Sequence, residues 1–265
     1  IKIGSLSSGV DKNIPVNTGK YPNRVALIIG NEDYSGTLNA EINVVYARND
    51  AQVFREYAFN TLGVEERNLT LLTDATAGVM RREIDRAARL IEKMGSSSEL
   101  IFYYAGHGFP DEATQVPYLV PVDVNATNLS VAIKLSEVYD KFGNSGAGRV
   151  TVFLDACFSG GGRNQGLLTA RAVKIKPKTE TVKGNMVVFT ASSGEQSSLP
   201  LETEMHGMFT YFLLKKLQES KGNTNYKEFA DYLRYNVPIE SLRVNGKDQE
   251  PEVIVSSDVK DSWGT

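Results

Sequence analysis

Cysteine is nearly absent from this sequence. The 265 residues include one cysteine, Cys157, and two histidines, His107 and His206. A lone cysteine cannot form a disulfide within the chain, so the class of small secreted domains that disulfides hold together is excluded. The sequence also lacks the C-x-x-C pair that is typical of thiol redox proteins. The single thiol is therefore either a buried core residue or a group that carries chemistry.

Long apolar runs and a strong excess of one charge are also absent. No run approaches the roughly 18 apolar residues that a membrane-spanning helix needs, and no signal-peptide pattern opens the sequence. The formal net charge is −3, so neither nucleic acid nor a membrane is expected as a partner. Because the sequence begins with Ile1 rather than Met, we expect a truncated N-terminus. A cytoplasmic location is favoured over the others.

Apolar runs alternate with amphipathic stretches along the chain. Strands are predicted at 24–30, 69–72, 100–105, 118–122, 150–155, 186–191 and 252–255, and helices at 43–62, 79–94, 135–142, 206–219 and 226–235. The alternation predicts a three-layer α/β fold with a mainly parallel central sheet flanked by helices. Residues 1–23 are predicted to be a polar arm or linker, and residues 24–265 a single domain.

Two segments combine a buried-strand pattern with one reactive side chain. Residues 100–108 run from apolar residues into Gly-His-Gly, and residues 150–162 run from apolar residues into Asp-Ala-Cys-Phe-Ser-Gly. Ligands bind at the carboxyl ends of parallel strands, so two such strands side by side would present His107 and Cys157 to each other. A thiol nucleophile with an imidazole base is the pair that a cysteine peptidase uses. A core cysteine would lie inside the apolar run, so a catalytic role for Cys157 is the favoured interpretation.

Small residues around the histidine favour the same chemistry. Gly106 and Gly108 leave the imidazole uncrowded and allow a substrate main chain to approach. The amide N–H groups of Gly108 and Cys157 are candidates for stabilising an oxyanion in acyl transfer. The other histidine, His206, precedes a predicted helix and is interpreted as a helix cap or a surface residue.

The two segments also resemble a known family. Tyr-Tyr-Ala-Gly-His-Gly (103–108) and Asp-Ala-Cys-Phe-Ser-Gly (155–160) are similar to the two catalytic motifs of the caspase-like clan, most of all to the bacterial relatives of metacaspases and paracaspases. His107 lies 50 residues before Cys157, a separation typical of caspases. The resemblance covers nearly the whole chain. It implies a caspase-like fold and a cysteine endopeptidase with His107 and Cys157 as its catalytic pair.

The resemblance further implies cleavage after Arg or Lys, because metacaspase-like and paracaspase-like members hold a basic side chain with acidic ones. Asp50, Asp155 and Glu195 match acidic positions of that pocket, and Ser192 lies on the edge that pairs with the substrate main chain. Carboxylates gathered in one cleft repel each other unless a cation neutralises them. The alternatives are a helix-surface charge for Asp50, a buried hydrogen-bond acceptor for Asp155 and a solvated side chain for Glu195. Arg48 would weaken the preference if its side chain entered the pocket.

The segment 160–184 interrupts the regular pattern. It is glycine-rich at its start, basic afterwards and without periodicity, so it is predicted to be a mobile loop. A peptidase that cleaves after Arg or Lys could cut its own chain there, and caspase relatives are commonly activated by such cuts. Arg163, Arg171 and Lys174 are the candidates for self-cleavage of a zymogen.

No cofactor is expected. A calcium site made of oxygen ligands needs several carboxylates, but residues 161–166 contain no acid, and Asp123 is the one candidate remnant of such a site. Calcium is therefore not expected to be required, which departs from the metacaspase pattern. The expected partner is a protein or peptide substrate with a basic residue before the scissile bond, and a monomer is favoured over a dimer.

Two hypotheses from other functional classes compete with the peptidase hypothesis. A catalytically silent caspase-like scaffold or interaction module is the main alternative, although inactive members usually lack one residue of the catalytic pair, and this chain keeps both. A nucleotide-binding α/β domain is the other alternative. It is disfavoured because no G-x-G-x-x-G follows the first predicted strand, and acidic residues stand where phosphate would bind.

Overall fold

A computed structural model describes residues 8–37, 42–124, 129–158, 176–193 and 196–264. Its centre is a six-stranded sheet in the order β11-β8-β7-β3-β1-β2. The five strands other than β11 run parallel, and β11 pairs antiparallel with β8 at one edge. The strands are β1 (Arg24–Gly30), β2 (Leu69–Thr73), β3 (Glu99–Ala105), β7 (Arg149–Asp155), β8 (Met186–Thr190) and β11 (Glu252–Val255). The predicted central sheet is thus confirmed.

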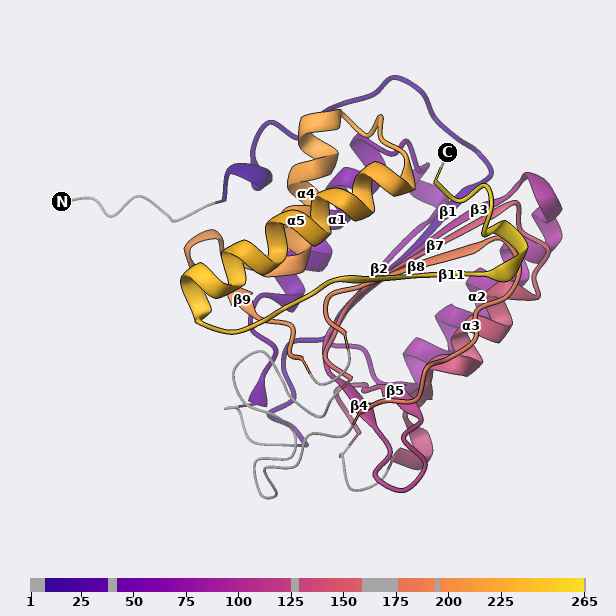
Figure 1. Cartoon of the computed structure of the whole chain (residues 1–265). Helices are drawn as coiled ribbons and strands as arrows, with labels where there is room; N and C mark the ends of the chain where they lie inside the picture. The colour runs from indigo at the N-terminus through magenta and orange to yellow at the C-terminus, as the bar shows by residue number, and fades with distance from the viewer. Residues whose placement is uncertain (1–7, 38–41, 125–128, 159–175, 194–195, 265) are drawn as a thin grey trace.

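Helices cover both faces of this sheet and give the three layers that the sequence predicts. Helices α1 and α4 pack against one face of the sheet, with α5 alongside, and helices α2 and α3 form the layer on the other face (Figure 1). The helices are α1 (Ala47–Asn60), α2 (Ala77–Met94), α3 (Leu135–Gly143), α4 (Met208–Ser220) and α5 (Tyr226–Asn245). Short 3₁₀ turns lie at Gly9–Asp11, Glu66–Asn68, Gly95–Ser97, Leu129–Val131, Glu202–Glu204 and Ser257–Val259.

The burial pattern explains why the sequence forms these elements. Strands β1, β3 and β7 are buried at all but their first residue, because helices cover both of their sides. Helix α2 instead buries one stripe, Met80, Ile84, Ala87 and Ile91, which is the spacing of an amphipathic helix. Strands that are apolar on both faces need helices on both sides, and helices with one apolar stripe bury it against the sheet. A layered arrangement meets both requirements.

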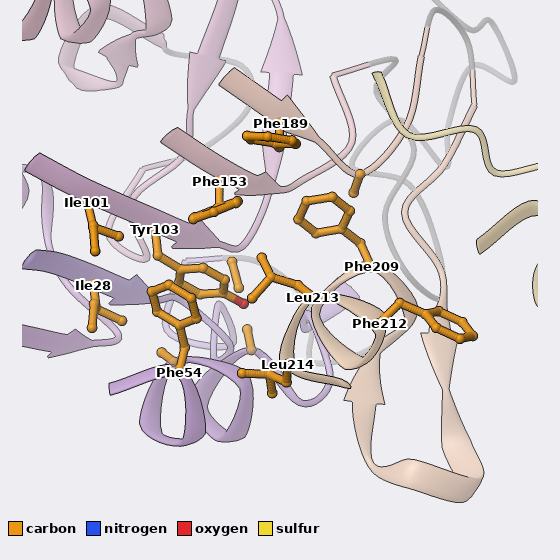
Figure 2. Close-up of a cluster of buried hydrophobic side chains, with 14 of the residues drawn as sticks. Ile28, Phe54, Ile101, Tyr103, Phe153, Phe189, Phe209, Phe212, Leu213 and Leu214 are labelled. Carbon is orange, nitrogen blue, oxygen red and sulfur yellow. The ribbon is translucent and has the colours of Figure 1, made fainter. Parts of the chain in front are cut away.

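Aromatic side chains join α1 and α4 to the sheet. Figure 2 shows Phe54 of α1 lying against Tyr103 of β3, with Leu213 and Leu214 of α4 pointing toward the strands. The Phe54 and Tyr103 rings are stacked with their centroids 4.5 Å apart. Tyr103 is fully buried, and its hydroxyl forms a 2.6 Å hydrogen bond with the Thr210 hydroxyl on α4. The core on this face therefore includes a polar contact between β3 and the first turn of α4.

Two small sheets lie beside the central one. One contains β4 (Gly108–Pro110), β5 (Pro117–Leu119) and β6 (Ile133–Lys134), and the other contains β9 (Pro200–Leu201) and β10 (His206–Gly207). The strand predicted at 118–122 belongs to the first small sheet and spans only Pro117–Leu119. The helix predicted to start at residue 206 starts at Met208, because the two residues before it pair with β9.

Helix α5 is longer than the sequence predicts. It was expected to end at residue 235 but continues to Asn245, through Pro238. Proline removes a backbone donor and usually breaks a helix interior. Here Val237 and Ser241 are buried on either side of it, so tertiary packing outweighs the missing hydrogen bond.

The N-terminal segment follows the helical layer of α1 and α4. Val10 is buried, and its carbonyl accepts a 2.8 Å hydrogen bond from the Tyr57 hydroxyl on α1. The Asn17 side chain donates to the Thr61 carbonyl at 2.7 Å, and the Gln218 side chain on α4 donates to the Lys12 carbonyl at 2.7 Å. Among the residues that the structure describes, no helix is long and apolar enough to span a bilayer.

Candidate active site

The two reactive segments leave the sheet side by side. Strands β3 and β7 are parallel neighbours whose last residues, Ala105 and Asp155, are register partners. The amide N–H of Gly106 donates to the Asp155 carbonyl at 3.4 Å, which extends the pairing by one residue. His107 and Cys157 each follow two residues after that pair. The sequence-based expectation that the two motifs meet at one edge of the sheet agrees with this register.

Glycine at position 108 is required by the close approach of the two motif loops. A Cβ added to Gly108 would lie 2.8 Å from the Cys157 carbonyl oxygen and 2.7 Å from the Phe158 ring. Real Cβ atoms essentially never come this close to other heavy atoms. The backbone that follows His107 therefore lies directly against the backbone that follows Cys157.

The main chain of His107 is held by two buried tyrosines. Its N–H donates to the Tyr34 hydroxyl at 3.0 Å, and its carbonyl accepts from the Tyr104 hydroxyl at 2.7 Å and from the Val120 N–H at 3.0 Å. Burial raises the pKa of both tyrosines, so their hydroxyls stay protonated. The loop that carries the histidine is thus fixed by hydrogen bonds on both sides of the residue.

The imidazole itself is oriented by a backbone carbonyl. His107 Nε2 lies 2.5 Å from the Ile42 carbonyl oxygen, and the Tyr34 ring packs against the imidazole with centroids 4.6 Å apart. A carbonyl oxygen only accepts, so Nε2 carries the proton in the neutral ring and Nδ1 is the basic nitrogen. The contact with the Ile42 carbonyl therefore sets the tautomer of the neutral ring.

The thiol of Cys157 contacts the segment that follows β8. The Ser198 N–H points at Sγ with a separation of 2.5 Å, and Sγ lies 3.6 Å from the Ser198 carbonyl oxygen. The N–H contact stabilises negative charge on the sulfur, whereas donation to the carbonyl requires the thiol proton, so the two contacts act in opposite directions on the nucleophilic thiolate. Cys157 is 3% exposed and His107 is 1% exposed, so both reactive groups are covered in this structure.

Asp155 is a buried acceptor that connects the cysteine loop to α4. Its carboxylate accepts hydrogen bonds from the Ser198 hydroxyl, from the Thr210 hydroxyl at 2.6 Å and from the Thr210 N–H at 3.2 Å. The residue is 1% exposed. Ser198 therefore contacts both Asp155 and the thiol, and Asp155 steadies the loop that carries the cysteine.

Asp50 is also buried at the start of α4. Its two carboxylate oxygens lie 3.1 Å from the Gly207 N–H, and its Oδ1 lies 2.7 Å from His206 Nδ1. The other ring nitrogen of His206 lies 2.8 Å from Asp11 Oδ1 in the N-terminal segment. Gly207 is the N-cap of α4 and Thr210 lies in its first turn, so Asp50 and Asp155 both bind the positive end of this helix.

The interpretation of His206 as a cap or surface residue is wrong. Its side chain is 0% exposed, and Gly207 rather than His206 occupies the N-cap position. Burial alone would lower the pKa of His206, but the hydrogen bonds and charges of Asp11 and Asp50 outweigh it and raise the pKa to about 9. A buried imidazolium between two carboxylates is neutralised on both sides, which makes its burial tolerable.

Among the other predicted residues, Arg48 and Ser192 lie in described parts of the chain. Arg48 pairs with Asp74 and lies 3.5 Å from Asp33. Its side chain therefore points to the residues that follow β1 and β2 and not to the two carboxylates of the predicted pocket. Ser192 follows β8, and its hydroxyl lies 3.4 Å from the Gln196 carbonyl. The helix-surface alternative for Asp50 is excluded by its complete burial.

Several predicted residues fall outside the described residues. These are Glu195 of the proposed acidic pocket and the self-cleavage candidates Arg163, Arg171 and Lys174. Asp123 is described, and its carboxylate accepts a 2.8 Å hydrogen bond from the Ala77 N–H at the start of α2. Within the described ranges, no cluster of three or more His, Cys, Asp or Glu side chains is arranged to hold a metal ion.

Sequence reasoning missed Tyr34, Tyr104, Ser198 and the role of His206. Ser198 lies 41 residues after Cys157, and His206 lies 156 residues after Asp50, so no local spacing links these pairs. Tyr104 was visible as part of the third strand, but a buried tyrosine there is equally typical of core packing. Only the tertiary fold shows which of these polar groups converge.

The architecture and the paired strand-end motifs define a caspase-like α/β fold, and comparison with known proteins agrees. A model of the caspase domain, peptidase family C14, matches residues 23–261, so the chain belongs to the caspase-domain family. Members of this family are generally cysteine peptidases. No curated protein matches the chain.

Two solved structures share the fold at low sequence identity. Protein GSU0716 from Geobacter sulfurreducens is 19% identical, with a TM-score of 0.65, and the match covers 89% of this chain and 94% of that one. Caspase-1 from Spodoptera frugiperda is 14% identical, with a TM-score of 0.61, and the match covers 92% and 91%. At these identities the likeness shows the fold alone.

Proposed function

We propose that this chain is a cysteine endopeptidase that uses Cys157 as nucleophile and His107 as general base and acid. The observation that carries the proposal is the pairing of β3 and β7, whose last residues are in register and are each followed two residues later by one member of the pair. Family membership supports the same chemistry. The contact of His107 Nε2 with the Ile42 carbonyl leaves Nδ1 as the basic nitrogen that can take the proton of the Cys157 thiol.

The proposed reaction proceeds in two acyl-transfer steps. The Cys157 thiolate attacks the carbonyl carbon of the scissile peptide bond, and the resulting oxyanion is stabilised by the N–H groups of Gly108 and Cys157. The imidazolium of His107 then gives its proton to the leaving amine. Water, deprotonated by the same imidazole, hydrolyses the thioester and restores the thiol. The close approach of Gly108 to the Cys157 backbone supports this choice of donors.

We further propose that the enzyme cleaves after Arg or Lys. Ser198 links Asp155 to the thiol, and Asp50 binds the N-cap of the same helix whose first turn Asp155 binds, which supports a role for both carboxylates in the pocket. Arg48 pairs with Asp74 and Asp33 and so does not offset the charge of Asp155, whereas the His206 imidazolium already balances part of the charge of Asp50. Ser192 on the strand edge and Glu195 complete the proposed substrate contacts. No cofactor or calcium is included in this mechanism, and the working form is a monomer.

The burial of both reactive residues favours a zymogen. A substrate must reach Cys157 and His107, which are 3% and 1% exposed. Self-cleavage after Arg163, Arg171 or Lys174 would be the activating step. The same burial favours the second candidate, a silent caspase-like scaffold, if no condition exposes the thiol.

The decisive experiment is hydrolysis of fluorogenic peptides that end in Arg, Lys or Asp, compared between the wild type, Cys157→Ala and His107→Ala. We expect cleavage after Arg and Lys and none with either variant. Because the chain has a single cysteine, an irreversible arginyl chloromethyl ketone must give one adduct, at Cys157, by mass spectrometry. Cleavage after Asp would overturn the acidic specificity. Absence of cleavage and of adduct in both intact and self-cut protein would leave the scaffold.

A further inference from the structure

A cavity lies at the amino-terminal ends of β3 and β7, opposite to the strand ends that carry the candidate active site. It has an inner part of about 140 Å³ and an outer part of about 310 Å³. The two parts adjoin, because both are lined by Arg149, Thr224, Asn225 and Tyr226. Neither part is lined by a residue of the candidate active site, so the cavity calls for an explanation of its own.

The inner part is lined mainly by apolar side chains of the sheet and of the helices that cover it. These include Ile101 of β3, Phe153 of β7, Leu217 of α4 and Phe229 of α5. Ile101 is 8% exposed and Phe153 is 6% exposed, although both lie within buried strands, so solvent reaches the sheet at this point. An apolar cavity of about 150 Å³ binds benzene. The inner part therefore has room for a phenyl ring or a branched alkyl group.

Polar side chains of the inner part bind each other. The hydroxyls of Thr151 and Tyr226 share a hydrogen bond. The Arg24 guanidinium pairs with the Glu99 carboxylate and also donates to the Leu62 carbonyl. A ligand would therefore place its apolar body in the inner part and its polar head group in the outer part.

Two opposite charges line the outer part without pairing with each other. Arg149 is exposed, its Cζ lies 5.6 Å from the centre of the Tyr226 ring, and it forms no ion pair with any residue that the structure describes. The acid across from it on β3, Glu99, is already paired. Glu228 of α5 is exposed as well, and its carboxylate accepts from the Thr224 hydroxyl at 3.3 Å but has no cationic partner in the described ranges. One cation and one anion thus stand beside an apolar cavity.

We propose that this cavity binds a free amino acid with an apolar side chain of the size of leucine or phenylalanine. The α-carboxylate pairs with Arg149, the α-ammonium pairs with Glu228, and the side chain fills the inner part. A zwitterion carries both charges on one carbon, so it can bridge two protein charges that do not reach each other. The inference does not depend on the proposed peptidase activity and adds a ligand site at the other end of the same strands.

The test uses probes that share a phenyl ring and differ in charge. L-Phenylalanine has both charged groups, phenylpropanoate lacks the ammonium, and phenethylamine lacks the carboxylate. Each probe is titrated into isotope-labelled Cys157→Ala protein and followed by NMR, so that no hydrolysis contributes. We expect L-phenylalanine to bind on the order of tenfold more tightly than either of the other two, with shifts at the amides of residues 223–228.

Charge-removing variants separate the two contacts. Arg149→Gln should weaken L-phenylalanine and phenylpropanoate by on the order of tenfold and should not weaken phenethylamine. Glu228→Gln should weaken L-phenylalanine and phenethylamine and should not weaken phenylpropanoate. Arg234→Gln and Glu250→Gln remove exposed charges outside the cavity and are the matched controls, which should bind all three probes like the parent protein.

The side chain of the ligand tests the inner part independently. L-Asparagine has nearly the shape of L-leucine but ends in polar groups, and it should bind on the order of tenfold more weakly than L-leucine. Equal binding of these two amino acids would overturn the proposal. So would equal effects of the two charge variants on all three phenyl probes, shifts confined to the residues around Cys157, or the absence of shifts with L-phenylalanine at about 10 mM.

Discussion

Asp155 and Asp50 are two buried carboxylates at the same end of α4, and their charges are compensated in different ways. Asp155 accepts from uncharged donors, the hydroxyls of Ser198 and Thr210 and one backbone N–H. Asp50 also accepts a backbone N–H but shares the His206 imidazole with Asp11. Burying a charge is costly unless it is paired or well hydrogen-bonded. Asp155 is hydrogen-bonded to neutral groups, and Asp50 is paired with a charged imidazole.

The difference determines what each site can respond to. The donors around Asp155 do not titrate near neutral pH, so this network holds the Cys157 loop in the same way over a broad range. The network around Asp50 contains a histidine, the side chain whose charge responds most readily to pH, and a carboxylate from the N-terminal segment. The first site steadies the candidate active site, and the second ties the N-terminal segment to the start of α4.

Removing the Asp155 carboxylate should have the largest effect. Asp155→Ala leaves three buried donors without their acceptor, and we expect the free energy of unfolding to fall by about 3–5 kcal/mol. Peptide hydrolysis should be lost as well, because Ser198 no longer holds its position against the thiol. Urea unfolding followed by circular dichroism measures the first effect. Asp155→Asn keeps the volume and one acceptor oxygen and should lose less; equal stability of wild type and Ala variant would refute the role of this network.

The Asp50 network should make stability depend on alkaline pH. Because folding raises the pKa of His206 from its usual 6.5 to about 9, the folded state favours the imidazolium. The resulting stabilisation, about 3 kcal/mol for a shift of that size, is fully present below pH 6.5 and is lost as pH rises through 9. His206→Gln should lack this difference. NMR titration in Cys157→Ala can follow His206 directly, because the chain has only one other histidine; an ordinary pKa would disprove the ion-pair assignment.

The sequence predicted the parts of this arrangement that have a local signature. Buried strands such as β3 and β7 are continuous apolar runs, and the small residues after them marked where His107 and Cys157 leave the sheet. The mainly parallel arrangement then followed from the alternation of strands and helices. These are features of pattern and spacing, which a single sequence contains.

The compensation of the two carboxylates has no such signature. Asp155 was predicted to be either a pocket residue or a buried acceptor, and its hydrogen bonds to Ser198 and Thr210 agree with the second description. Its partners come from segments that the fold brings in from far along the chain. The same holds for His206, whose burial depends on Asp11 in a segment that was expected to be only a polar arm.

Cutting one donor of the Asp155 network should have an intermediate effect. Thr210→Val removes a hydroxyl that contacts both the Asp155 carboxylate and the Tyr103 hydroxyl, while the side-chain volume stays nearly the same. We expect a loss of about 2 kcal/mol, because the phenol and one carboxylate oxygen lose a buried partner. Thr210→Ser retains the hydroxyl and should lose less. If Thr210→Val unfolds at the same urea concentration as the wild type, the hydroxyl contributes nothing to stability and this assignment is wrong.

The smallest effect is expected where the N-terminal segment enters the Asp50 network. Asp11→Asn removes one of the two charges that hold the His206 imidazolium, so the pKa of His206 should fall and about 1 kcal/mol of stability should be lost at pH 7. Above pH 9 the imidazole is neutral, and the variant should then match the wild type. Ser8→Ala is the control, because it removes the hydroxyl that the same segment donates to the Glu204 carboxylate, a contact without His206, and its effect should be the same at pH 7 and pH 10. Equal losses from Asp11→Asn at pH 7 and pH 10 would mean that the segment is held by hydrogen bonding alone, and the distinction between the two carboxylate sites would disappear.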